Sequence, residues 1–451
     1  MTTIALEGLA RDIRRIRATR PFGRVVHVGA GLIHVDGIAG IAQVGDLIDI
    51  LASSGARIGG EVISLSKAKT IILPDTPLEG VSIGDEVLLS GALKIAPSDA
   101  WIGRIVDASG VPMDGYFLPR GPQERSVHGQ APNPAERCCL GPRLETSMGV
   151  FNTLLPIVRG QRLGLFSGSG VGKSSLLAHF ASQMQADVIV IALIGERGRE
   201  LRNFVESVLG PDGMARSVVV AATSDQSPLL RRRCALSAMS VAEHFRDQGK
   251  QVLLLADSIT RFAEAHREIA VASGEAASLR GFPASTAHTI MSLCERAGPG
   301  LEGRGDITAI FSVLVAGSDM EEPIADIMRG VLDGHVVLDR AIAERGRYPA
   351  IDVVRSVSRS LPEAASAKEN ELISIARRLL GSYDENALMI RAGLYSAGSD
   401  AVLDIAIKAF PELDRFIATQ ERLGAENSFQ RLELILRKAG ALELGEPISL
   451  A

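Results

Sequence analysis

Residues 162–180, which decide the fold, read RLGLFSGSGVGKSSLLAHF. The apolar run RLGLF predicts a buried strand, and LLAHF after the glycine-rich stretch predicts a helix. Between them, Gly168, Gly170 and Gly172 allow backbone N–H groups to surround an anion at the start of the helix. The stretch therefore predicts a phosphate-binding loop that joins a strand to a helix, and with it an α/β fold.

The loop matches the pattern GxxxxGK followed by Ser or Thr at every position but the first, where Ser167 replaces glycine. Serine tolerates most backbone conformations except positive φ, so this departure affects only the start of the loop. We expect Lys173 to contact the β- and γ-phosphates and the Ser174 hydroxyl to bind Mg²⁺. A glycine-rich turn with an incidental lysine is the alternative, and the flanking strand and helix argue against it. The predicted nucleotide-binding residues of the loop are Ser167, Gly168, Ser169, Gly170, Val171, Gly172, Lys173, Ser174 and Ser175.

A second apolar run, QVLLLAD, ends at Asp257. A carboxylate at the end of a strand that neighbours the loop is well placed to bind Mg²⁺ through water. Taken alone, Asp257 could instead cap the helix predicted in SITRFAEAHRE. The phosphate-binding loop upstream favours the metal role.

The composition excludes several classes of protein. Of 451 residues, 46% are hydrophobic and 22% are charged, which excludes wholesale disorder. The net charge of -5 argues against a polyanion binder that uses the whole chain, although it leaves a local basic patch open. The longest apolar run, Val188 to Ile194, has seven residues and is too short to span a bilayer. The chain shows no apolar leader, and its four cysteines contain no CxxC pair, so we expect a reduced cytoplasmic compartment. None of the eight His falls at metal-binding spacing.

The first two of four expected segments are residues 1–22 and 23–92. The first is predicted to be an amphipathic helix, because apolar residues recur at helical spacing and five Arg oppose two acidic residues, for a net charge of +3. The second alternates with a period of two and has frequent turns, which predicts a small antiparallel β-barrel or sandwich.

The other two segments are residues 93–365 and 366–451. In the first of these, the runs RLGLFSG, DVIVIALIG, SVVVAAT, QVLLLADS and DITAIFSVLVAG alternate with helical patterns, which predicts a mostly parallel sheet covered by helices. The second is predicted to be helical throughout, with breaks at Gly381, Gly398 and Gly440.

Three stretches, DVIVIALIGERGREL, LLLADSITRFAEAHREI and RYPAIDVVRSVSRS, resemble the catalytic subunits of rotary ATPases. Within that family, ERAG at 295–298 and YDENALMIRAGLYSAGSD at 383–400 are similar to the type III secretion branch, with the flagellar subgroup favoured over the virulence subgroup. The resemblance implies an N-terminal β-barrel, a central RecA-like P-loop domain and a C-terminal helical domain. It also implies an ATP hydrolase that uses Mg²⁺ and assembles as a homohexamer.

The resemblance assigns roles around the loop. Glu196, after a buried strand, would position and activate the attacking water, and Lys173 and Arg197 would hold the γ-phosphate. Glu200 and Arg261 would complete the polar surroundings. The alternative for Glu196, Arg197 and Glu200 is a solvated charged turn.

Two further residues are assigned in the same way. Arg359 matches an arginine finger that reaches the nucleotide of a neighbouring subunit, and its alternative is a surface arginine near a helix start. Tyr348 matches an aromatic ring that stacks on adenine, and its alternative is a core tyrosine beside Pro349.

Three functions remain open at this stage. A protein export ATPase and the catalytic subunit of a proton-translocating ATP synthase share the same chemistry, but Glu196 and Arg359 in one chain favour a ring of identical subunits. A hexameric nucleic-acid motor needs a basic or aromatic β-domain, whereas residues 23–91 have four basic and eight acidic residues and no Tyr or Trp. Nucleic acid is therefore not expected as a partner.

The resemblance implies several protein partners. The arginine-rich amphipathic pattern of the N-terminal helix suits docking to a partner protein or to an anionic membrane surface, and the alternative is a helix packed on its own barrel. The resemblance implies that this helix binds a stator-like regulatory protein. Further expected partners are a central stalk-like protein, export gate membrane proteins, and export substrates with their chaperones. The expected location is the cytoplasm, peripheral to the inner membrane at the flagellar base.

Overall fold

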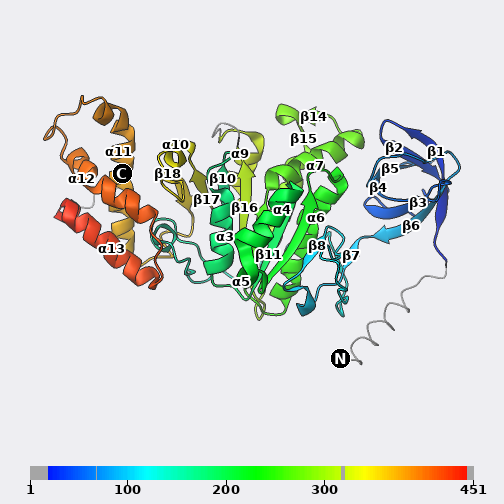
Figure 1. The fold of residues 1–451 in the computed structure, drawn as a ribbon, viewed down its shortest axis with the longest axis horizontal. Coiled ribbons are helices and arrows are strands. Elements are labelled where there is room, and N and C mark those ends of the chain that lie inside the picture. Colours follow the sequence, from blue (N-terminus) through cyan, green and yellow to red (C-terminus); the bar gives the residue numbers. More distant parts are fainter. Residues whose placement is uncertain (1–18, 68, 316–319, 444–451) are drawn as a thin grey trace.

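The computed structural model of the chain describes residues 19–67, 69–315 and 320–443. A small barrel, a central sheet with helices and a group of C-terminal helices follow one another along the longest axis (Figure 1). This arrangement confirms the fold class predicted from the sequence. The helix predicted over residues 1–22 lies outside the described residues except at its end, where Phe22 begins the first strand.

The first part is a barrel built from β1 (Phe22–Gly29), β2 (Leu32–Asp36), β3 (Asp46–Leu51), β4 (Arg57–Leu65), β5 (Thr70–Pro74) and β6 (Glu86–Ala92). The barrel is closed, in the order β1-β2-β5-β4-β3-β6. Side chains point inward at every second residue, as at Ile48 and Ile50 of β3. The period of two therefore forms a barrel and not a sandwich, and closure leaves no exposed sheet edge.

The central sheet is built from β8 (Ile105–Asp107), β10 (Arg162–Ser167), β11 (Val188–Glu196), β12 (Ser217–Thr223), β13 (Val252–Asp257), β16 (Ile307–Leu314), β17 (Gly334–Leu338) and β18 (Ile351–Ser358). Its eight strands follow the order β18-β17-β10-β16-β13-β11-β12-β8. All neighbours run parallel except β17 and β18, which are antiparallel. The five apolar runs quoted from the sequence form the central strands, whose near-continuous burial is expected when both faces are covered.

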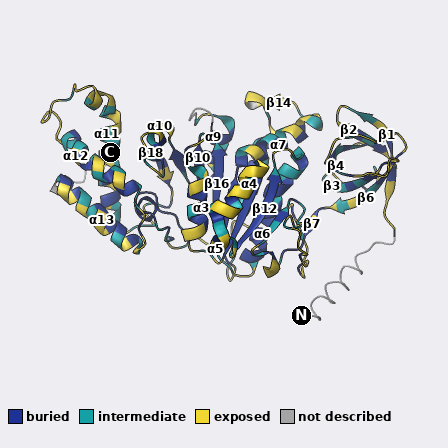
Figure 2. Ribbon diagram, in the orientation of Figure 1, coloured by how far each residue is buried: buried dark blue, intermediate teal, exposed yellow. Residues whose placement is uncertain are grey.

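Helices pack on both faces of this sheet, and the strands between them are buried (Figure 2). Ile189 and Ile191 of β11 join the apolar cluster on one face, whereas Val188 and Val190 join the cluster on the other. The helices of this part are α2 (Gly149–Asn152), α3 (Lys173–Gln183), α4 (Gly198–Asn203), the π-helical segment η2 (Phe204–Leu209), α5 (Gly210–Met214), α6 (Pro228–Asp247), α7 (Ile259–Ala272), α8 (Ser285–Arg296), α9 (Pro323–Val331) and α10 (Arg340–Glu344). Smaller elements are β7 (Lys94–Ile95) paired with β9 (Arg125–Ser126), β14 (Ala277–Ser278) paired with β15 (Phe282–Pro283), and the 3-10 turns η1 (Asp99–Trp101) and η3 (Leu279–Gly281).

The C-terminal part consists of α11 (Ala367–Arg391), α12 (Ala401–Ile417), α13 (Gly424–Ala439) and the short turn η5 (Ala441–Glu443). The predicted break at Gly381 is wrong, because α11 continues through it. A glycine costs a helix only about 1 kcal/mol, and the neighbouring Leu379 and Leu380 are buried. Gly398 does lie between α11 and α12, and Gly440 ends α13 with a φ of +81°. Within the described ranges, none of the helices has the length and apolar content to cross a membrane.

Buried ion pairs join the barrel to the central sheet. Glu61 of β4 accepts hydrogen bonds from Arg232 at 2.5 Å and from Arg233 at 2.9 Å, both near the start of α6. Arg233 also donates to Asp75 at 3.2 Å. Removing one partner of such a pair would leave an uncompensated buried charge, so the contact between barrel and sheet depends on all of these residues.

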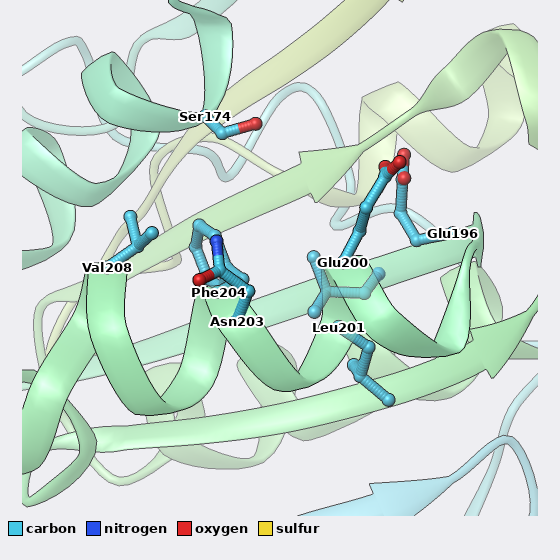
Figure 3. Close-up of a pocket in the computed structure, with 8 residues that line it drawn as sticks. Ser174, Glu196, Glu200, Leu201, Asn203, Phe204 and Val208 are labelled. Atoms are coloured by element: carbon cyan, nitrogen blue, oxygen red, sulfur yellow. The ribbon is translucent and has the colours of Figure 1, made fainter.

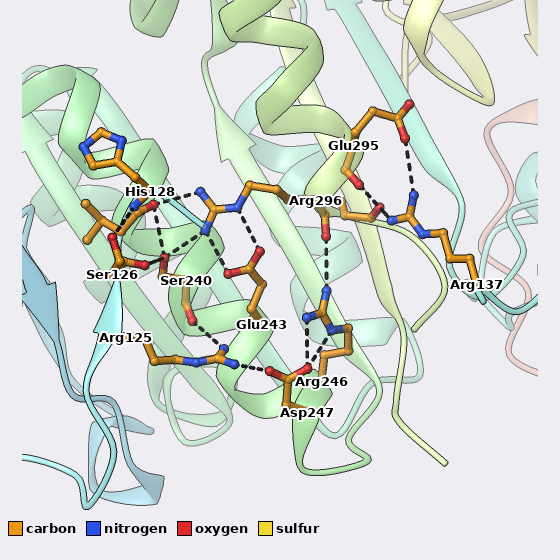
Figure 4. A network of polar contacts seen from close by, with 12 residues as sticks. Arg125, Ser126, His128, Arg137, Ser240, Glu243, Arg246, Asp247, Glu295 and Arg296 are labelled. Atoms are coloured by element: carbon orange, nitrogen blue, oxygen red, sulfur yellow. Dashed lines mark hydrogen bonds and ion pairs between the residues drawn. The ribbon is translucent and has the colours of Figure 1, made fainter. Parts of the chain in front are cut away.

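A second polar network fastens the long segment before α2 to the end of α8 (Figure 4). Arg296 donates to both carboxylate oxygens of Glu243 at 2.8 Å and to the carbonyl of Val127 at 2.8 Å. Arg137 donates to the carbonyl of Glu295 at 2.8 Å. Glu295 and Arg296 begin the stretch ERAG, which therefore forms a structural junction.

Candidate functional site

The glycine-rich loop lies between the end of β10 and the start of α3, as the sequence predicts. Gly170 and Gly172 have φ angles of +77° and +87°, which residues with side chains rarely adopt. Gly172 directly precedes Lys173, the first residue of α3. An anion at this point would meet the unpaired N–H groups of the first helical turn.

Ser167 ends β10 and is fully buried. Among the described non-glycine residues, φ is positive at Ala30, Ser147 and Arg280, so Ser167 keeps an ordinary backbone conformation. Serine in place of the first glycine therefore introduces no backbone strain. The Ser167 hydroxyl has no hydrogen-bond partner among the described residues, which leaves a buried polar atom next to the loop.

Lys173 and Asp257 meet at the edge of the sheet, where the ammonium group contacts Oδ1 of the carboxylate. Ser312 of β16 donates to the same oxygen at 2.5 Å. The alternative role for Asp257 does not hold, because Ser258 caps α7 by accepting from the backbone N–H of Arg261. Asp257 is therefore a buried carboxylate directed at the phosphate-binding loop.

A β-bulge at the end of β11 sets the position of Glu196. The pairing of β11 with β12 shifts register between Ile194 and Glu196, and Gly195 has a φ of +68°. A Cβ atom at Gly195 would lie 3.3 Å from Arg231 and 3.5 Å from Arg261. Bulges beside active sites change the direction of a side chain, so Gly195 belongs to the candidate site although the motif reading did not include it.

Glu196 and Glu200 form a hydrogen-bonded carboxyl pair near the phosphate-binding loop (Figure 3). Burial, and after it the charge of Asp257, raises the pKa of Glu196 to about 7, although Lys173 opposes the rise. Burial alone would raise the pKa of Glu200, but hydrogen bonds with Glu196 and Arg197 lower it. A carboxyl group with a pKa near 7 can accept a proton at neutral pH, which a general base requires.

A cavity of about 150 Å³ opens beside the carboxyl pair. Its polar lining consists of Ser174, Glu196, Glu200 and Asn203, and its apolar lining of Leu193, Leu201, Phe204 and Val208 (Figure 3). Leu201 and Asn203 of α4 and Phe204 and Val208 of η2 are new members of the site, whereas Glu200 of α4 was predicted from the sequence. π-Helical turns are rare and often occur at functional sites, but their apolar spacing is too close to that of an α-helix to be recognised in a sequence.

Arg197 and Arg261 lie around the carboxyl pair. The side chain of Arg197 is 75% exposed and donates to Glu200 at 2.8 Å. Arg261 donates to Glu264 at 2.8 Å, and this bond, followed by the charges of Glu264 and Glu196, raises the pKa of Arg261. In the free chain Arg197 thus occupies a solvated turn, and its contact with a γ-phosphate stays a prediction.

The ring of Tyr348 packs against the phosphate-binding loop. A Cβ atom at Gly172 would lie 3.1 Å from Cδ1 and 3.3 Å from Cε1 of this ring. Tyr348 is nevertheless 52% exposed, so it is not a core tyrosine. An exposed ring beside the loop offers a surface on which a base can stack.

Arg359 lies at the other ends of the strands, opposite the ends that carry the phosphate-binding loop. Leu338, the last residue of β17, pairs with Ser167 at the loop, whereas Gly334, the first, pairs with Ser358. The four residue steps from Gly334 to Leu338 correspond to roughly 13 Å of strand. Arg359 directly follows Ser358 and is therefore remote from the nucleotide-binding loop of its own chain.

The structure thus divides the predicted residues into two groups. The phosphate-binding loop, Glu196, Asp257 and Tyr348 gather at one edge of the sheet. At the other edge, the Arg359 guanidinium donates to the carbonyl of Arg329 at the end of α9, 3.1 Å away.

Comparison with known families agrees with this geometry. Residues 147–358 match the ATP synthase alpha/beta family, nucleotide-binding domain. Residues 365–433 match the T3SS EscN ATPase C-terminal domain. The first range contains the phosphate-binding loop, the carboxyl pair and Tyr348, and it ends one residue before Arg359.

Individual relatives cover almost the whole chain. A flagellum-specific ATP synthase of Treponema pallidum is 45% identical over 93% of this chain and 95% of its own length, and one of Salmonella typhimurium is 39% identical over 96% and 97%. Among solved structures, the assembled ATPase EscN from the enteropathogenic E. coli type III secretion system has a TM-score of 0.84 and 35% identity, covering 92% of this chain and 100% of that chain. EscN in complex with its central stalk EscO has a TM-score of 0.83 over the same shares. The chain is therefore an ATP hydrolase that belongs to the flagellum-specific ATP synthases, the flagellar branch of the type III secretion ATPases.

Proposed function

We propose that the chain works as a homohexamer that couples ATP hydrolysis to the delivery and unfolding of exported flagellar proteins. The observation that carries this proposal is the separation of the phosphate-binding loop and Glu196 from Arg359 by the length of the sheet strands. A site with both parts needs a second copy of the chain. A closed ring of identical subunits supplies such a site at every interface.

In this proposal each group at the loop has one task. Residues 167–175 bind the phosphates through backbone N–H groups, and Lys173 exchanges its contact with Asp257 for the β- and γ-phosphates. Glu196 accepts a proton from the attacking water, for which a pKa of about 7 is suitable. Arg197 turns toward the γ-phosphate, and Tyr348 stacks on the adenine.

Mg²⁺ fits the same edge of the sheet. The Ser174 hydroxyl lines the cavity beside Glu196, and the Asp257 carboxylate is buried at the loop. The described ranges contain no cluster of three or more His, Cys, Asp or Glu side chains that could hold a metal by itself. This arrangement suits an ion held by one or two protein oxygens, water and nucleotide, which would neutralise charge developing on the phosphates.

Mixed assemblies test the proposed ring. Lys173→Ala and Arg359→Ala should each be inactive alone, whereas rings that contain both should regain partial ATP hydrolysis. Some interfaces then pair an intact loop with an intact arginine. Co-assembled rings that stay inactive would argue against a finger supplied by the neighbour, and full activity of a monomer at every concentration would reject it.

The flagellar assignment rests on relatives such as those of Treponema and Salmonella, which are flagellum-specific, and it is favoured over a virulence system or a rotary ATP synthase. The proposed partners are a central stalk-like protein, as EscN has in EscO, a stator-like regulatory protein, export gate membrane proteins, and export substrates with their chaperones. The proposed location is the cytoplasmic side of the inner membrane at the flagellar base. Co-purification from cells should recover flagellar export components, and recovery of virulence components would contradict this assignment.

Deletion of residues 1–20 tests the proposed docking of the regulatory protein. The barrel should still fold, because its first strand begins at Phe22. Regulator binding should be lost while ATP binding remains. A truncated chain that still binds the regulator would place the docking site elsewhere.

A further inference from the structure

A buried amide links the start of β10 to the end of β18. Gln161 precedes β10 by one residue and is fully buried. Its Nε2 donates to the carbonyl of Asp333 at 3.0 Å and to the Ser358 hydroxyl at 3.2 Å. Its Oε1 accepts from the backbone N–H of Val158 at 2.9 Å. Both ends of the amide are therefore bonded, and two of its three partners flank Arg359 in space.

The carbonyl of Asp333 accepts hydrogen bonds from both Gln161 and Arg359. It accepts the backbone N–H of Arg359 at 3.0 Å as well as the Gln161 amide. Gly334 has a φ of +151°, and a Cβ atom there would lie 2.6 Å from the carbonyl oxygen of Val357. β17 and β18 can therefore approach closely at this point, which brings the backbone of Arg359 within reach of the amide network.

The Ser358 hydroxyl extends the network to the segment before β10. It donates to the carbonyl of Pro156 at 2.6 Å and lies 2.8 Å from the hydroxyl of Ser360. Ser358 and Ser360 are both buried, on either side of Arg359. The backbone that carries the finger is thus fixed before, at and after Arg359.

We infer that Gln161 is a positioning residue for Arg359, which it holds in the place from which the guanidinium reaches the neighbouring subunit. This inference rests on the proposed trans finger. Gln161 itself has no access to nucleotide in its own chain, because all of β10 separates it from the phosphate-binding loop. Displacing a catalytic group by about 1 Å can cost up to 10²-fold in rate. Loss of the Gln161 hydrogen bonds is therefore expected to lower kcat.

The test combines two substitutions. Gln161→Met keeps a similar volume but removes both donors, and we expect kcat to fall roughly tenfold or more with nucleotide affinity unchanged. In an Arg359→Ala background, Gln161→Met should cause no further fall, because a finger that is absent cannot be displaced. A residue with only a structural role would lower turnover by the same factor in both backgrounds.

Thr308→Val is the matched control. Thr308 is a buried polar residue at the same edge, and its hydroxyl accepts from the backbone N–H of Gly160 at 2.9 Å without contact to Asp333 or Ser358. We expect this variant to lose stability, measured as a melting temperature, and to keep its turnover. A fall in kcat equal to that of Gln161→Met would make the effect structural and overturn the inference.

The remaining outcomes are distinct. Unchanged turnover of Gln161→Met in the otherwise native chain, or an equal loss in the Arg359→Ala background, overturns the positioning role. Full turnover of Arg359→Ala alone contradicts the proposed finger and removes the basis of the inference with it. If Gln161→Met does not fold, Ser358→Ala carries the same cycle, because it removes the hydroxyl that the amide contacts.

Discussion

The polar groups near the two ends of β10 differ in whether they have hydrogen-bond partners within the chain. At the C-terminal end the Ser167 hydroxyl has no partner among the described residues, and the nearby Glu196 has a raised pKa. At the N-terminal end Gln161 and Arg162 have partners within the chain for their side-chain groups. Polar groups that lack partners in the free protein are those that a ligand can satisfy. The end proposed to bind nucleotide therefore leaves a buried hydroxyl for a ligand, whereas Gln161 and Arg162 at the other end are bonded within the chain.

The difference predicts how each end responds to substitution. Removing a group from the loop end should lower activity with little loss of stability, because that group contributes few bonds to the folded chain. Removing a group from the opposite end should leave buried partners unpaired and lower the free energy of unfolding. Arg359 lies at the second end but is proposed to take part in hydrolysis, which makes it the exception that tests the comparison.

Lys173→Ala should have the largest effect and abolish ATP hydrolysis. The change removes the ammonium group proposed to bind the phosphates, while the fold is expected to remain because Ser312 still donates to the buried Asp257 carboxylate. Steady-state hydrolysis and a melting temperature measure the two effects. Lys368→Ala, which removes an ammonium paired with Glu433 on the surface, is the control and should keep full activity. Hydrolysis that persists in a folded Lys173→Ala protein would contradict the phosphate site.

Arg359→Ala should lower turnover by about 10³-fold with nucleotide affinity much less affected. In the native protein, specific activity should rise with protein concentration as subunits assemble, because each site of the proposed ring needs a neighbour. Hydrolysis measured across a concentration series checks both statements. Arg329→Ala is a suitable control, because Arg359 bonds only its backbone carbonyl. A small effect of Arg359→Ala would mean that Arg359 is a surface arginine without a role in hydrolysis.

Glu196→Gln should lower hydrolysis by about 10²-fold while nucleotide still binds. In the native protein turnover should rise with pH through about 7 and then level off, because the ionised carboxylate is the form that accepts a proton. The residual activity of the variant should lack this rise. Glu206→Gln, at an exposed carboxylate paired with Arg202, is the control. Loss of nucleotide binding together with turnover would point to a structural role for the turn.

Arg162→Met should lower the free energy of unfolding by about 3 kcal/mol, because it removes the guanidinium that pairs with Asp333 and leaves Glu295 with Arg137 alone. Arg162 donates to Asp333 at 3.0 Å and to Glu295 at 2.5 Å, and its side chain is largely buried. Chemical denaturation without nucleotide measures the loss. Arg340→Met, in an exposed pair with Glu344, should change stability by less than about 0.5 kcal/mol. Equal losses in both variants would show that the two ends of β10 do not differ.

The sequence predicted the loop end of β10 well because its signals are local. A strand, a glycine-rich loop and a helix follow one another within residues 162–180, and strands that end at Glu196 and Asp257 meet at the same edge of a parallel sheet. The roles of these residues in hydrolysis stay predictions. What the structure adds is their proximity and the raised pKa of Glu196.

The other end could not be predicted in the same way. Gln161, Asp333 and Ser358 are nearly 200 residues apart at the extremes, and no spacing pattern connects a side-chain amide with a distant backbone carbonyl. The bulge at Gly195 was missed for a related reason, because a register shift depends on the partner strand. The helix break predicted at Gly381 was wrong, because the packing of α11 outweighs the low helix preference of glycine.

The smallest expected effect concerns the stability of the same Glu196→Gln variant. Glu196 has a pKa of about 7 in the folded chain, above the ordinary value of 4.5, so the folded state binds its proton more tightly than the unfolded state. The stability contributed by that proton is complete below pH 4.5 and is lost as the pH rises through 7. Gln stays neutral at every pH, so the variant should gain on the native protein between pH 5.5 and pH 8, by on the order of 1 kcal/mol for a partly exposed group.

Chemical denaturation without nucleotide at those two pH values measures the gain, and Glu206→Gln should show none. A difference between native and variant that does not change with pH would mean that the carboxyl pair is not strained in the free chain. If the stability of the variant relative to the native protein increases with pH, the ionised Glu196 carboxylate destabilises the free chain. The opposite end, where Arg162 and Gln161 lie, should show no such gain for any substitution that removes a bonded group.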